Sequence, residues 1–90
     1  MRATHRTSLT FSYESESVAT AVAAAVRVEA GEIEGGRTRA SVERDGEAVR
    51  VTVTAADLTA LRAGANTWTT LVAVAERGHD AGRTHADLSK

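Results

Sequence analysis

The Asp45-Gly46 pair lies between two segments of alternating apolar and polar side chains, and it constrains the fold more than any other local feature. Asp-Gly favours a type I′ hairpin turn, because both central residues of that turn need a positive φ. A two-residue loop here pairs Arg44 with Glu47 and Val42 with Val49, which places the valines on one face. We therefore predict an antiparallel hairpin that seeks a core on one side only. The other face carries Arg39, Ser41, Glu43, Arg50, Thr52 and Thr54.

The chain before the hairpin predicts a strand and then a helix. Mainly apolar and polar side chains alternate along residues 5–13, as they do in a half-buried strand. Ser15 or Ser17 can cap the helix that follows, and we expect Gly31 to end it. Residues 32–36 then form a connector. The helix buries apolar positions that recur every three or four residues: Val18, Val22, Ala25 and Val26.

A long second helix is predicted after the hairpin. Thr54 and Asp57 have the spacing of a capping box, in which both side chains satisfy free amides at a helix start. We expect this helix to end near Gly78, and we expect residues 79–90, which are polar and aperiodic, to form a disordered tail. The apolar stripe that faces the sheet consists of Leu58, Leu61, Ala65, Trp68, Val72 and Ala75.

The order strand, helix, strand, strand, helix predicts an α+β fold. One layer of antiparallel sheet carries two helices packed on one of its faces. Residues 1–78 form a single domain in this prediction, and a length of 90 residues excludes a second one. An architecture of this kind does not define a function by itself.

The expected core is thin. The chain has 38 hydrophobic side chains, but 18 of these are alanine and only three are aromatic. A chain of this length buries only about 60 to 65% of its unfolded surface, so we expect the protein to associate with a partner. Its net charge of -1 encodes no overall attraction to nucleic acid or to acidic lipid.

The sequence contains no membrane or secretion signal. No apolar run approaches the roughly 20 residues that cross a bilayer, and residues 1–8 do not resemble a secretory signal peptide. The chain has no cysteine, which excludes disulfides and thiolate metal sites. We expect a cytoplasmic protein that binds no membrane. Arginine outnumbers lysine ten to one, which suggests a GC-rich genome, and we expect an archaeal source.

A search for catalytic and cofactor-binding groups finds none that a rigid element would hold. His5, His79 and His85 lie near the termini, whereas a catalytic group must be held to sub-ångström tolerance. A dinucleotide fingerprint, a P-loop and the Gly-x-x-Gly loop of KH-type RNA-binding modules are all missing. We therefore expect no enzyme activity, no metal and no cofactor.

The outer faces of both predicted helices carry small side chains and few charges. Freely solvated helices usually present many Lys and Glu side chains, whereas small residues let another helix approach closely. Alanine is also a good helix former, so its abundance can explain the pattern without a partner. We predict partner binding through Ala19, Ala23, Arg27, Arg62, Ala63, Asn66, Thr70 and Ala73.

The polar face of the predicted sheet supports an alternative hypothesis. Arg6, Arg39 and Arg50 can contact RNA or steady a dimer there, although cross-strand pairing with Glu43 also explains them. On this alternative the chain is a stand-alone small RNA-binding module. Its near-neutral charge and its lack of exposed aromatic residues argue against it.

Residues 54–67, which read Thr-Ala-Ala-Asp-Leu-Thr-Ala-Leu-Arg-Ala-Gly-Ala-Asn-Thr, resemble the signature of a known family. This is the small dimerising (Pcc/CTAG-type) subunit of the KEOPS (EKC) complex. In that family an acidic helix start leads into Ala-Leu-Arg, small residues and an Asn-Ser or Asn-Thr pair. The resemblance runs from His5 to Glu76, and its matching residues are Asp57, Leu61, Arg62, Asn66 and Thr67.

The resemblance implies a noncatalytic role in tRNA modification. KEOPS makes threonylcarbamoyl-adenosine in tRNA, and a separate metal-dependent subunit transfers the threonylcarbamoyl group. The small subunit is similar to a clamp that dimerises, bundles its two helices with helices of the transferase subunit and supports tRNA binding indirectly or weakly. Gly64 inside the second helix weakens it by about 1 kcal/mol relative to alanine, a cost that is tolerable if a partner backbone packs there. The thin core fits a divergent paralogue. A homodimer and a heterodimer with a paralogue therefore both stay open.

Overall fold

A computed structural model describes residues 4–33 and 37–88, with the side chains of residues 4–30 and 37–80. The sheet has the strand order β1-β4-β3-β2, with every neighbouring pair antiparallel. The predicted α+β fold is confirmed, and the chain adds one short strand within the predicted connector. Its elements are β1 (His5–Ser12), α1 (Glu16–Arg27), β2 (Gly31–Ile33), β3 (Thr38–Asp45), β4 (Ala48–Ala55) and α2 (Leu58–Leu88).

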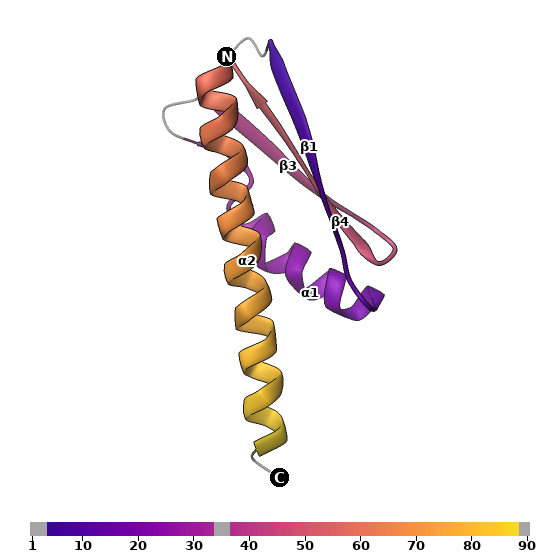
Figure 1. Cartoon of the computed structure of the whole chain (residues 1–90). Helices are drawn as coiled ribbons and strands as arrows, with labels where there is room; N and C mark the ends of the chain where they lie inside the picture. Colours follow the sequence, from indigo (N-terminus) through magenta and orange to yellow (C-terminus); the bar gives the residue numbers. More distant parts are fainter. Residues whose placement is uncertain (1–3, 34–36, 89–90) are drawn as a thin grey trace.

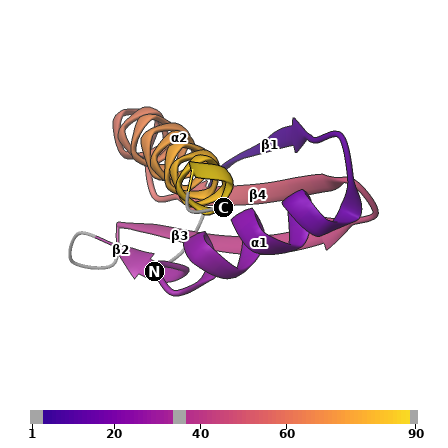
Figure 2. The same cartoon turned by 90° about the horizontal axis from the view of Figure 1, so that it is seen from below.

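Both helices pack on the same face of the sheet, as predicted. Helix α1 crosses β3 and β4, whereas α2 lies over β4 and β1, and the two helices contact each other (Figures 1 and 2). The core between them contains Trp68 of α2 and the alternating valines of β4, with Leu9 and Phe11 of β1 packed against it. The opposite face of the sheet is left uncovered by helices.

Helix α1 begins where the sequence predicted and ends earlier. Ser15 is the N-cap, and its hydroxyl oxygen accepts a hydrogen bond from the backbone N–H of Val18 at 3.2 Å. The last helical residue is Arg27, with Val28 as the C-cap, so the predicted end at Gly31 is wrong. Gly31 instead begins β2, where it pairs with Ala40 of β3.

The β3–β4 hairpin forms, but its register differs from the predicted one by two residues. Asp45 pairs with Ala48, so the loop consists of Gly46 and Glu47, and Val42 lies opposite Val51. Gly46 has a φ of +62°, a conformation that glycine adopts without the steric cost of a Cβ. Glycine thus occupies the first loop position, whereas the predicted turn had it at the second. A shift of two residues leaves every side chain on its predicted face.

Helix α2 differs from the prediction at both ends. Its N-cap is Asp57 rather than Thr54: the Asp57 Oδ1 accepts a hydrogen bond from the Ala60 N–H at 2.8 Å, whereas Thr54 belongs to β4. The helix also passes through Gly78 and reaches Leu88, so the predicted end near Gly78 is wrong. The predicted disorder of residues 79–90 stays a prediction. Residues 89–90 lie outside the described residues. That residues 1–78 form the complete domain stays a prediction.

Gly64 explains why α2 lies so close to the sheet. A Cβ at this position would be 3.0 Å from Cγ1 of Val53 and 3.3 Å from Cγ2 of Thr38. Both neighbours are buried. Gly64 therefore packs against side chains of the protein's own sheet, where the sequence had suggested the backbone of a partner. In the part of the chain that is described, no helix has the length and apolarity to span a bilayer.

Candidate partner-binding surface

The outer face of α2 carries exposed side chains that are mostly small and uncharged. Arg62, Ala63, Asn66 and Thr70 all lie on it, as the sequence predicted, and Ala73 is half-buried at its margin. Val74 extends this face and is 52% exposed. Between Leu58 and Ala75 the helix has one charged side chain, Arg62. We define the α2 outer face as seven exposed positions that recur at helical spacing: Thr59, Arg62, Ala63, Asn66, Thr70, Val74 and Arg77. Leu58, Thr69, Gly78 and Asp80 of the same helix are also exposed.

The predicted binding residues on α1 are partly wrong. Ala19 is 0% exposed and Ala23 is 1% exposed, because both pack with Val22 and Val26 in the core. Neither can contact a partner while the domain is folded. Arg27 is exposed, as predicted. Apart from Glu16, the exposed side chains of α1 and of its C-cap form the α1 outer face: Ser17, Thr20, Ala24, Ala25, Arg27 and Val28.

The correct α1 face could have been found from spacing alone. Ala19, Val22, Ala23 and Val26 recur at intervals of three and four, which makes a stripe as regular as the one that the sequence analysis chose. The error came from giving valine more weight than alanine. Val22 and Val26 are buried as predicted, but Ala25 is exposed, and Ala19 and Ala23 are buried in its stead. The exposed Ala24 and Val28 were missed as a result, and Val28 is 81% exposed.

The uncovered face of the sheet is polar and carries rows of hydroxyl groups. The register places Ser8, Thr52 and Ser41 side by side, and the hydroxyl oxygens of Ser8 and Thr52 are 3.5 Å apart. Arg6 and Arg39 flank Thr54 in a parallel row. The predicted contact residues Arg6, Arg39 and Arg50 therefore share this face.

Acidic groups offset the arginines on the same face. Arg50 lies opposite Glu43, and its Nη2 is 3.8 Å from Oδ2 of Asp45. Three guanidinium groups thus share the described part of this face with two carboxylates. The balance gives this face no strong positive field.

Strand β1 is an open edge of the sheet. Its eight residues pair with β4 on one side only, without a bulge. The Thr4 N–H donates to the Ala55 carbonyl at 3.1 Å and the Tyr13 N–H donates to the Glu47 carbonyl at 2.9 Å, so the pairing with β4 extends past both ends of β1. In an antiparallel edge strand, every second residue directs its backbone N–H and C=O groups away from the sheet. Such an edge is a template for pairing with another strand.

Asp57, the N-cap of α2, carries a carboxylate that is held by both a hydrogen bond and an ion pair. The Asp57 carboxylate accepts the Ala60 N–H and pairs with Arg37. The hydrogen bond from Ala60 and then the Arg37 charge lower the pKa of Asp57 below its ordinary value of 3.8. The carboxylate therefore stays charged at the positive end of the helix dipole, where a negative charge stabilises the helix.

The histidines are not brought together. His5 lies on β1, where Nδ1 is 2.9 Å from the Thr4 hydroxyl, and His79 lies far from it on α2. The side chain of His85 lies outside the described residues. Among the described side chains, no three His, Asp or Glu residues are grouped as metal ligands.

Comparisons with known proteins agree with this geometry. The family model described as "Transcription factor Pcc1" matches residues 6–78. A chain in the crystal structure of the binary complex Gon7-Pcc1 has the same fold, with a TM-score of 0.75 over 89% of this chain and 98% of that chain. The sequence identity is 16%. No curated protein matches the chain.

Proposed function

Because this chain belongs to the Pcc1 family, we propose that it is a noncatalytic dimerisation and assembly subunit of the KEOPS complex. In this role it binds the threonylcarbamoyl-transferase subunit through its two helices and supports tRNA threonylcarbamoyladenosine modification. Contact with tRNA is indirect or weak. The protein acts in the cytoplasm without a cofactor of its own.

The observation that carries the proposal is the character of the two helix outer faces. The exposed positions of α1 between Ser17 and Ala25 are all uncharged, and α2 has no acidic residue between Leu58 and Ala75. Val28 and Val74 are large apolar side chains left in solvent, with exposures of 81% and 52%. Small side chains let a second pair of helices approach within the 8–10 Å of close helix packing. Burial of the two valines would then favour association.

The free edge of β1 supplies a separate surface for dimerisation. An antiparallel pairing of two β1 strands would satisfy the unpaired backbone groups of both chains around a two-fold axis. A paralogue with the same edge could take the place of the second copy. This arrangement leaves both helix outer faces available for the transferase subunit.

The charge distribution does not support direct binding to nucleic acid as the main function. Neutralising phosphates requires a net positive surface, and the uncovered sheet face sets Glu43 and Asp45 against its arginines. The described surface of that face includes no aromatic side chain on which a base could stack. The stand-alone RNA-binding module therefore gains no support, and neither does DNA binding of the kind that the words "transcription factor" suggest.

A charge placed on each helix outer face tests the proposal. Ala24→Glu and Ala63→Glu change exposed positions, so both variants should keep the thermal unfolding midpoint of the wild-type chain. Each should weaken capture of the transferase subunit of the same genome by at least about tenfold, since a buried unpaired carboxylate costs more than 1.4 kcal/mol.

Ser41→Glu is the matched control, because Ser41 is exposed on the uncovered sheet face. It should leave capture unchanged. Wild-type affinity in both helix variants would show that the helices do not form the interface. Equal losses in all three variants would point to a nonspecific effect of charge.

A further inference from the structure

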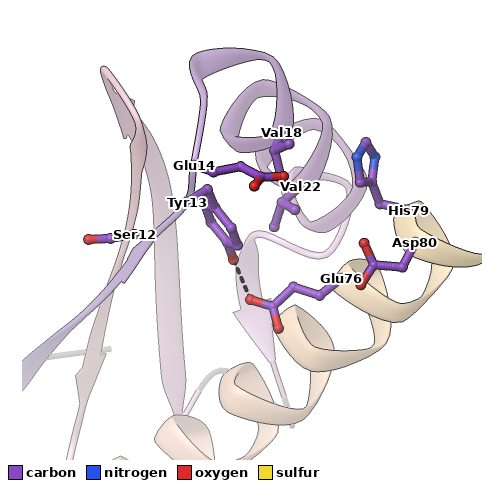
Figure 3. A pocket seen from close by; sticks show the side chains of 8 residues that line it. All are labelled: Ser12, Tyr13, Glu14, Val18, Val22, Glu76, His79 and Asp80. Atoms are coloured by element: carbon purple, nitrogen blue, oxygen red, sulfur yellow. Dashed lines mark hydrogen bonds between the residues drawn. The ribbon is translucent and has the colours of Figure 1, made fainter. Parts of the chain in front are cut away.

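A groove opens where the end of β1 and the start of α1 meet the distal half of α2. Figure 3 shows its eight lining residues, which come from all three segments. The cavity has a volume of about 370 Å³. This lies within the roughly 300 to 1,000 Å³ of cavities that hold small molecules or single side chains of a partner.

One wall of the groove is apolar and ordered. Val18 and Val22 of α1 line it, together with the ring of Tyr13. The Tyr13 hydroxyl donates a hydrogen bond of 2.6 Å to Oε2 of Glu76, which ties β1 to α2 across the groove (Figure 3). Burial, and then this hydrogen bond, raises the pKa of Tyr13 above its usual range, so the hydroxyl keeps its proton and acts as a donor to Glu76.

The other side of the groove is acidic. Glu76 and Asp80 of α2 and Glu14 before α1 all line it, and among the described residues neither Lys nor Arg does. Glu76 and Asp80 are four residues apart, so they lie one helical turn from each other on α2. Like charges at this spacing destabilise a helix by about 0.2 to 0.5 kcal/mol. A cation between them would relieve that repulsion.

A second feature of the groove is an unused polar atom. His79 also lines the groove. Its Nε2 atom is shielded from solvent and has no hydrogen-bond partner among the described atoms. A buried ring nitrogen without a partner costs free energy, so an incoming donor or acceptor would be stabilised there.

We propose that this groove binds an arginine side chain of the partner protein that docks on the two helices. The aliphatic stem would lie against Val18 and Val22, and the guanidinium would lie between Glu76 and Asp80. Arginine fits better than lysine, because its planar fork can donate to two carboxylates at once and can stack on the Tyr13 ring. The choice of partner rests on the proposed function, but the preference of the groove for arginine does not.

Titration of the chain alone with N-acetyl-argininamide tests this preference. The expected result is a saturable NMR shift of the Val18 and Val22 methyl groups and the Tyr13 ring, with half-saturation on the order of 1 mM. N-acetyl-citrullinamide has the same shape without the charge and should produce no saturable shift. Equal shifts with the two compounds, or no saturable shift with either compound, would overturn the proposal.

The double variant Glu76→Gln/Asp80→Asn identifies the groups responsible. Glutamine keeps an oxygen that can accept the Tyr13 hydrogen bond, so the groove should stay intact while its affinity for N-acetyl-argininamide falls at least about tenfold. Glu43→Gln, on the uncovered sheet face, removes a charge elsewhere and should bind as wild type does. Unchanged affinity in the double variant would overturn the proposal. Because no partner is present, this outcome is independent of whether the transferase subunit binds.

Discussion

At the scale of single residues, Gly64 sets the distance between α2 and the sheet. Helix propensity alone favours alanine over glycine at an interior position by about 1 kcal/mol. Here the new methyl group would meet Val53 at 3.0 Å, and Val53 is 0% exposed, so it has little room to move. Forcing an extra carbon into a packed core costs about 1 to 3 kcal/mol.

Gly64→Ala should therefore destabilise the fold by about 1 kcal/mol net, the larger packing cost outweighing the gain in propensity. Gly78→Ala is the matched control, because a Cβ at Gly78 meets no atom within 4 Å. That variant should gain up to about 1 kcal/mol. Urea unfolding followed by the fluorescence of Trp68, the only tryptophan, measures both. A stabilised Gly64→Ala would show that the helix does not press on the sheet.

Asp57 makes stability depend on pH through the start of α2. Its pKa is lower in the folded chain than in the unfolded one, first because the Ala60 N–H bonds the carboxylate and then because Arg37 lies beside it. A depressed carboxyl pKa stabilises the folded state fully above the unfolded value of 3.8, and this contribution is lost as pH falls through the folded value.

Asp57→Asn should remove this part of the pH dependence. Asparagine can still cap the helix, but it has no charge to lose. The difference in urea midpoint between wild type and variant should be largest at pH 7 and should shrink as the pH drops below about 4. A difference that stays constant down to pH 2 would mean that the charge of Asp57 contributes nothing.

At the scale of elements, the phase of α1 decides which alanines are available for binding. Ala23 is 1% exposed, whereas Ala24, the next residue, faces solvent. A glutamate at position 23 would bury a carboxylate without a partner, which costs several kcal/mol. That is a large share of the 5 to 15 kcal/mol that stabilise an ordinary domain.

Ala23→Glu should therefore abolish the cooperative thermal transition, whereas Ala24→Glu should stay within about 0.5 kcal/mol of wild type. Circular dichroism during heating distinguishes the two. If both variants melted like the wild-type chain, α1 would be rotated relative to its position in the fold described above.

The elements were predictable from alternation and spacing, but several of their boundaries were not. Each long strand and both helices follow from local patterns, because one face of each must be buried. The hairpin register was missed because Asp45-Gly46 and Gly46-Glu47 both offer glycine a positive φ, and only tertiary pairing chooses between them. Strand β2 was missed because three residues are too few for a periodic signal.

The end of α2 was missed because a single glycine does not oblige a helix to stop. Gly78 costs about 1 kcal/mol relative to alanine, and the helix continues through it to Leu88. The exposed side of α2 was predictable because Trp68 and Val72 define its buried side without ambiguity. On α1 the buried stripe holds two alanines and two valines, so weighting by side-chain size misplaced part of it although its spacing was regular.

At the scale of the whole molecule, the small core covers only part of the long helix α2. Among the described side chains, twelve hydrophobic residues are buried, and five of these are alanine: Ala19, Ala23, Ala40, Ala55 and Ala60. Helix α2 has 31 residues, and its distal part projects past the sheet and past α1 (Figure 1). The molecule is elongated, with extents of 52 × 23 × 17 Å. Such a shape leaves helix surface that a partner can cover.

Light scattering on the purified wild-type chain, alone and mixed with the transferase subunit of its own genome, tests the assembly role most directly. The chain mass is 9.4 kDa, so we predict a particle of twice that mass in isolation. In the mixture, we predict a larger particle that contains both proteins. A particle with the mass of a single chain, whose mass does not change when the transferase subunit is added, would contradict the proposed function.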